Sequence, residues 1–93
     1  MGAAMTTKAK RNELFFESAR LCDFPNVLAF VRLVRLSGDF AESVAIMTVG
    51  TIDSENDQRT IIDAHGKSNA DLIRMAIKEF DGYVADERSK WTQ

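Results

Sequence analysis

The sequence predicts an α+β protein in which a three-stranded antiparallel sheet lies between an N-terminal and a C-terminal helix (αβββα). Three observations lead to this prediction: two stretches rich in β-branched residues at 44–52 and 59–64, a polar run between them, and an amphipathic stretch directly afterwards. β-branched residues favour strands, whereas Asp, Ser and Asn favour the turns that join them. The first two observations predict a β-hairpin, and the third predicts a helix that packs on it.

Length and composition predict one globular domain. The chain has 93 residues, of which 45% are hydrophobic and 28% charged, as is typical of globular proteins. We expect a flexible basic arm over residues 1–11 and a single α+β domain over 12–93. The formal net charge of −2 does not favour binding to nucleic acid or to an anionic membrane. No run of about 18 apolar residues predicts a membrane span, and the single cysteine fits a cytoplasmic protein.

The first element is predicted to be a helix over residues 12–22. Asn12 is a favourable N-cap, and Glu13 would lie in the first turn. Pro25 would end the helix, because the residue before a proline is disfavoured in the α conformation. The residues that share one face at helical spacing are Leu14, Phe15, Ser18, Leu21 and Cys22.

The next segment, 27–36, is compatible with either a strand or a helix. As a strand it carries apolar residues on both faces, which suits a buried position. As a helix it would have Pro25 near its first turn, where proline is tolerated. If 39–50 were helical as well, the protein would be all-α, which is the alternative fold class. The density of β-branched residues in 44–52 favours the strand.

The predicted hairpin pairs Thr51 with Thr60 and Val49 with Ile62. One face of it then carries Met47, Val49, Thr51, Thr60, Ile62 and Ala64. The other face carries Ile46, Thr48, Ile52, Arg59, Ile61, Asp63 and His65. A slip of one residue in the pairing would exchange the two faces.

The C-terminal helix is predicted to begin after Ser68, with Asp71 three residues further on in a variant of the capping box. A continuous apolar stripe follows at helical spacing. It consists of Leu72, Ile73, Ala76, Ile77, Phe80, Tyr83 and Val84. This stripe is the surface that should pack on the sheet.

No catalytic or metal-binding pattern is found, so neither an enzyme nor a cofactor is expected. Cys22 and His65 are the only residues of their kinds; they could form a nucleophilic pair, although a buried, inert thiol is the usual state of a cysteine on an apolar stripe. Gly66, Lys67 and Ser68 stand between a strand and a helix, where backbone N–H groups can hold an anion. The P-loop pattern fails because its first glycine is replaced by Ile61. The simpler interpretation is that Gly66 turns the chain and Ser68 caps the helix.

The predicted order of elements resembles that of double-stranded-RNA-binding domains, which place lysines at the start of the final helix. Here that stretch supplies one lysine, Lys67. A nucleic-acid-binding protein that uses the basic arm together with Arg32, Arg35 and Lys67 is therefore the alternative function.

The leading functional prediction is a non-enzymatic protein-protein interaction module with an inhibitory or regulatory role, as in small accessory proteins of phage or plasmid type. The second face of the sheet carries more apolar side chains than an exposed face usually does, which predicts a homodimer, another protein partner, or both. Acidic residues in the strand connection would favour a basic partner. The predicted interface consists of Ile46, Ile52, Ile61, Arg59, Glu55 and Asp57.

Overall fold

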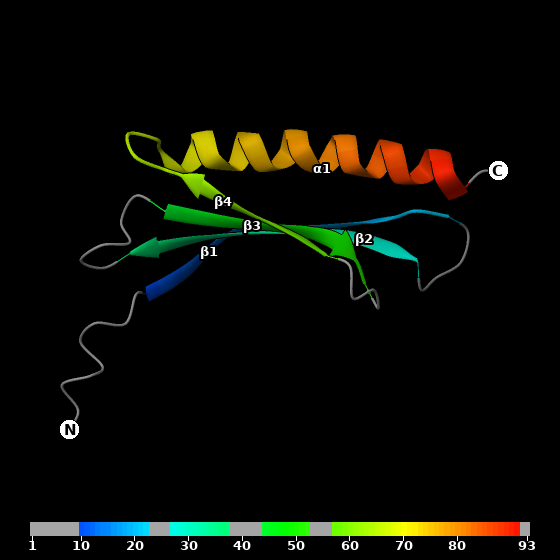
Figure 1. Ribbon diagram of the computed structural model, residues 1–93, viewed down its shortest axis with the longest axis horizontal. Helices are drawn as coiled ribbons and strands as arrows, with labels where there is room; N and C mark the ends of the chain where they lie inside the picture. The colour runs from blue at the N-terminus through cyan, green and yellow to red at the C-terminus, as the bar shows by residue number, and fades with distance from the viewer. Residues whose placement is uncertain (1–9, 23–26, 38–43, 53–56, 92–93) are drawn as a thin grey trace, which may run out of the picture.

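The computed structural model describes residues 10–22, 27–37, 44–52 and 57–91. Four strands are followed by one helix: β1 (Lys10–Arg20), β2 (Leu28–Ser37), β3 (Val44–Thr51), β4 (Gln58–Asp63) and α1 (Asn69–Trp91). The strands form one antiparallel sheet in chain order, and α1 lies along one face of it (Figure 1). The predicted α+β class is confirmed, but the arrangement is ββββα.

The predicted N-terminal helix is wrong, because its residues form β1. This strand pairs with β2 from Lys10 opposite Ser37 to Arg20 opposite Leu28, and the register shifts between Glu13 and Phe15. The β-bulge at this shift hides the strand pattern, since an extra residue interrupts the alternation of side chains. Two adjacent apolar residues, Leu14 and Phe15, both pack against the core, and such adjacency looks like a helical face. The all-α alternative is therefore also wrong.

The three predicted strands are confirmed as β2, β3 and β4, but the register of the hairpin differs. Thr60 lies opposite Met47 and Ile62 lies opposite Ala45, so β4 is displaced by four residues from the predicted pairing. An even displacement preserves the two faces, because side chains alternate with a period of two. The connection is longer than a tight turn: the last pair is Val49 with Gln58.

The predicted C-terminal helix is confirmed, together with its cap. The Ser68 hydroxyl accepts a hydrogen bond from the backbone N–H of Asp71 at 3.1 Å, and the Asp71 carboxylate accepts one from the backbone N–H of Ser68 at 3.4 Å. This reciprocal arrangement satisfies two N–H groups that a helix start leaves without partners. Gly66 precedes the cap with a φ of 75°, a conformation that favours glycine.

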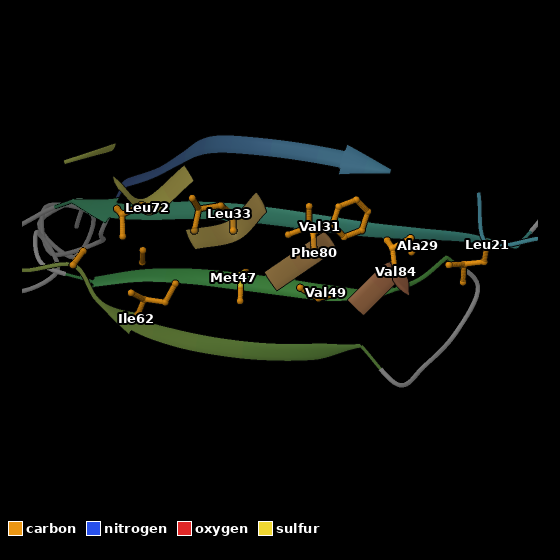
Figure 2. Close-up of a cluster of buried hydrophobic side chains, with 13 residues drawn as sticks. Leu21, Ala29, Val31, Leu33, Met47, Val49, Ile62, Leu72, Phe80 and Val84 are labelled. Carbon is orange, nitrogen blue, oxygen red and sulfur yellow. The ribbon is translucent and has the colours of Figure 1, made fainter. Parts of the chain in front are cut away.

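The core lies between α1 and the sheet (Figure 2). α1 contributes every fourth residue to it, which is the spacing of one helical face. Ile77, which was predicted to lie in the apolar stripe, is 40% exposed at its edge. The buried side chains are Leu21, Ala29, Val31, Leu33, Ala45, Met47, Val49, Ile62, Ala64, Leu72, Ala76, Phe80 and Val84.

Polar contacts hold α1 on the sheet along its length. At its start, the Arg35 guanidinium of β2 donates hydrogen bonds to the carbonyl of Lys67 at 3.1 Å and to Asn69 Oδ1 at 2.8 Å. The hydroxyls of Thr51 and Tyr83 lie 3.0 Å apart further along. Near its end, Arg88 donates to the carbonyl of Arg20 in β1. The helix packs on β1, β2 and β3, but none of its Cα atoms lies within 8 Å of a Cα atom of β4.

Candidate functional site

The open face of the sheet is the side opposite α1, and no element that the structure describes lies over it (Figure 1). Its side chains alternate along each strand with those of the core. Its apolar members in the strands are Phe16, Leu28, Phe30, Val34, Leu36, Val44, Ile46 and Ile61. Three of them form a row across the sheet, because Val34 lies opposite Ile46 and Ile46 opposite Ile61. Ile61 is 73% exposed and Phe16 is 44% exposed, so this side of the sheet presents apolar surface to solvent.

Arginines surround a shallow hollow of about 240 Å³ on the open face. Arg11, Arg32 and Arg59 come from three different strands and line it together with one acid, Asp57. Arg32 and Arg59 both lie opposite Thr48, so their strands are separated by about 10 Å. The described residues around the hollow therefore carry more positive than negative charge.

Arg32 is held in place by its neighbours. Its Nε lies 3.2 Å from a carboxylate oxygen of Glu13, and its guanidinium carbon lies 5.3 Å from the centre of the Phe16 ring, within the range of cation–π attraction. The Phe16 ring in turn stacks on Phe30, with 6.4 Å between ring centres. By contrast, Arg59 forms no ion pair with any residue in the described part of the chain.

Several of the predicted interface residues lie together on the open face. Ile46, Arg59 and Asp57 line the hollow, and Ile61 pairs with Ile46. Ile52 follows β3, is 38% exposed, and donates its backbone N–H to the carbonyl of Leu28. The remaining predicted interface residue, Glu55, lies outside the described residues.

Sequence reasoning missed the contribution of β1, namely Arg11, Glu13 and Phe16. These residues were assigned to an arm or to a helix, so they could not be placed beside Arg32. A signal was present in the second half of the segment, since Ala19 and Leu21 alternate with polar residues and both contact the core. Alternation over four to eight residues is the pattern of a half-buried strand.

The predicted anion site at residues 66–68 is occupied by the chain itself. The carboxylate of Asp71 accepts the backbone N–H of Ser68, so it stands where an incoming anion would bind. Hydrogen bonds from the backbone and side chain of Ser68 lower the pKa of Asp71, and the nearby Arg74 adds to this effect. Lys67 donates its own backbone N–H to the carbonyl of Ala64. This geometry fits a turn followed by a cap.

Two other arrangements considered from the sequence are not assembled. Cys22 follows the end of β1 that pairs with Leu28, whereas His65 follows β4 at the opposite end of the sheet, so roughly 25 Å of strand separates them. No three His, Cys, Asp or Glu residues within the described ranges could hold a metal ion together. None of the helical residues described forms a segment long and apolar enough to cross a membrane.

The residues of the nucleic-acid alternative do not form one patch. Arg32 lies on the open face, whereas Arg35 contacts the start of α1 on the other side. Of the predicted arm, residues 1–9 lie outside the described ranges, and Lys10 and Arg11 belong to β1. The helix that the resemblance to double-stranded-RNA-binding domains requires before the sheet is absent from the described elements.

Comparison of the chain with protein-family models, with curated proteins and with solved structures finds no match.

Proposed function

We propose that this protein is a non-enzymatic protein-protein interaction module that binds its partner through the open face of the sheet. The observation that carries the proposal is the row formed by Val34, Ile46 and Ile61, which has no described element over it. An inhibitory or regulatory role follows if occupying a surface of the partner is enough to alter the partner's activity. Such a role needs a complementary surface rather than a reaction centre.

The size of the open face supports this proposal. Four strands spaced about 4.8 Å apart and about eight residues long cover roughly 500 Å². The apolar patch is only part of this area, because Arg32, Thr48 and Arg59 share the face, and apolar patches of a few hundred Å² on monomers are often functional. With the flanking connections, the face could form one side of a standard interface of about 800 Å² per partner.

The charges on the face define the chemistry of the partner. Arg11, Arg32 and Arg59 surround the hollow, and only Arg32 has a carboxylate beside it within ion-pair distance in the described ranges. They favour a partner that is apolar at the centre and acidic around it, instead of the basic partner expected from the sequence.

A capture experiment with matched variants tests this proposal. The wild-type protein is immobilised and exposed to extract of its native host, with and without nuclease treatment. The variants are an open-face pair, Val34→Lys with Ile46→Lys, and a control pair, Met75→Lys with Ile77→Lys, at exposed positions of α1. We expect a protein retained by the wild type and the control to be lost with the open-face pair. Equal retention by all three would refute the proposal, as would capture that depends on intact nucleic acid.

A further inference from the structure

We propose that β4 pairs with β4 of a second copy of this chain, antiparallel and centred on Ile61, so that two four-stranded sheets join into one. The homodimer expected from the sequence was assigned to the face of the sheet, whereas the geometry points to its edge. The inference concerns the edge of the sheet, although Ile61 and Arg59 also belong to the open face. Its tests use pure protein without host extract, so this inference and the proposed function can fail separately.

The edge of β4 lacks several of the features that usually prevent strand addition. Natural edge strands are short, carry charged residues, a proline or a bulge, or are covered by another element. β4 is short and carries Arg59 and Asp63, but it has no proline and no bulge. β4 has the sequence QRTIID and pairs regularly with β3. It is the last strand in the sheet order, and no Cα atom of α1 lies within 8 Å of a Cα atom of β4, although Gln58 at the start of β4 lines a hollow together with residues of α1. The opposite edge, β1, contains the bulge between Glu13 and Phe15 and contacts α1.

The order of residues in β4 is complementary to itself in one register. In a two-fold symmetric pair of antiparallel strands, the central residue faces its own copy, and residues opposite each other point to the same face with Cβ atoms about 5 Å apart. Centring the pair on Ile61 places Ile61 against Ile61 and places Arg59 against Asp63 twice. Centring it on Thr60 places Arg59 against Ile61, and centring it on Ile62 places Ile61 against Asp63.

The groups that would meet are available in the single chain. Among the described residues, Ile61 is the most exposed of the large hydrophobic side chains, at 73%. Arg59 has no ion-pair partner among the described residues. Asp63 accepts the backbone N–H of His65 through Oδ1 at 3.0 Å, which leaves its second carboxylate oxygen for a guanidinium. Each copy therefore supplies the partners that the other lacks.

The expected affinity is modest, because β4 has six residues and is only about 20 Å long. Such an interface lies at the small end of the range, so we expect a dissociation constant in the micromolar range. The mass in solution should rise from 10.4 kDa towards twice that value between about 10 and 500 µM protein.

Exchanging the charges of Arg59 and Asp63 tests the register, and sedimentation equilibrium measures the dissociation constant of each variant. Arg59→Asp alone places a carboxylate opposite the carboxylate of Asp63 in the other copy, so it should raise the dissociation constant of the dimer at least tenfold. Arg59→Asp combined with Asp63→Arg restores opposite charges at these positions and should restore the dimer. Arg11→Asp makes the same change in net charge at the β1 edge and should leave the dimer intact. A wild-type protein that stays monomeric at the highest concentration would overturn the proposal. So would a dimer that survives Arg59→Asp, or a folded double variant that does not recover.

Disulfide cross-linking provides a second test that does not depend on charge. In a Cys22→Ser background, Ile61→Cys places two thiols directly opposite each other, where Cα atoms about 5 Å apart allow a disulfide. Arg59→Cys places them about 14 Å apart, which is too far. We expect a covalent dimer on mild oxidation of the first variant only. If Arg59→Cys cross-links as readily as Ile61→Cys, the register is wrong.

Discussion

Replacing Phe80 by alanine should remove a large part of the stability of this protein. Phe80 is 4% exposed and lies in the middle of α1, among the core side chains of β2 and β3 (Figure 2). A buried phenylalanine removes about 150–250 Å² from water, which at about 25 cal/mol per Å² corresponds to about 4–6 kcal/mol. Truncation of such residues to alanine costs about 3–5 kcal/mol.

That loss is large for a chain of this length. At about 0.05–0.15 kcal/mol per residue, 93 residues correspond to a free energy of unfolding of about 5–14 kcal/mol. Urea unfolding followed by circular dichroism measures the change, and with a slope of about 1.3 kcal/mol per M, a loss of 4 kcal/mol lowers the midpoint by about 3 M. All proteins are compared at one concentration, because self-association would add to the apparent stability.

The matched control is Ile77→Ala, which lies one turn away on the same helix but is 40% exposed. Since much of its surface already contacts water, we expect a loss of about 1 kcal/mol or less. If Phe80→Ala costs no more than Ile77→Ala, then α1 does not pack on the sheet through the face described above, and the side opposite α1 would no longer be the open face.

Two further predictions concern two glycines, Gly50 in β3 and Gly82 in α1, and the helix cap. A Cβ at Gly50 would lie 2.6 Å from the Cβ of Asp57, so Gly50→Ala should lower the free energy of unfolding by about 1–3 kcal/mol. At Gly82 an added Cβ meets nothing within 4 Å, so Gly82→Ala should instead stabilise α1 by about 0.5–1 kcal/mol. Thermal melts of both variants check this contrast. The hydrogen bonds from Ser68 lower the pKa of Asp71 below the usual 3.8. The free energy of unfolding of the wild type should therefore exceed that of Asp71→Asn by its full amount well above pH 3.8. This difference should disappear as the pH falls through the lower pKa that Asp71 has in the folded state. Urea midpoints of the two proteins at several pH values measure this, and a difference that does not change with pH would contradict it.

The sequence predicted those parts of the fold in which local and tertiary preferences agree. In α1, the cap formed by Ser68 and Asp71 and the apolar spacing both favour a helix. In β3, the β-branched residues favour the strand that pairing with β2 and β4 also requires. Where two independent preferences coincide, a single sequence is sufficient for the prediction.

β1 shows why the rest could not be predicted. Its local signals, an N-cap residue and adjacent apolar residues, indicate a helix, but the pairing of ten of its eleven residues with β2 determines its structure. The bulge after Glu13 is a tertiary feature that the residue pattern does not reveal. Because β1 supplies Arg11 and Phe16 to the open face, the same error concealed part of the candidate site and the positive charge around its hollow.

The register of β4 was beyond prediction for a different reason. Displacement by four residues keeps Ile61 outside and Ile62 inside, so the hydrophobic pattern is satisfied in both registers. Gly50 lies close to Asp57 because these two residues lie directly beyond the last pair, Val49 with Gln58, in the observed register, and only the structure shows this register. The faces could therefore be assigned from the sequence, but the row of Val34, Ile46 and Ile61 could not.

The most direct test of the central claim, that the open face binds a partner, is the rate at which a thiol on that face reacts in pure protein and in host extract. In a Cys22→Ser background, Ile46→Cys places the thiol on the open face, and Ile77→Cys places one on the exposed side of α1. With a maleimide reagent, we expect labelling of the Ile46→Cys variant to slow at least fivefold in nuclease-treated extract, while the Ile77→Cys variant keeps its rate relative to a small-thiol standard. Equal rates for the Ile46→Cys variant in buffer and in extract would contradict the claim.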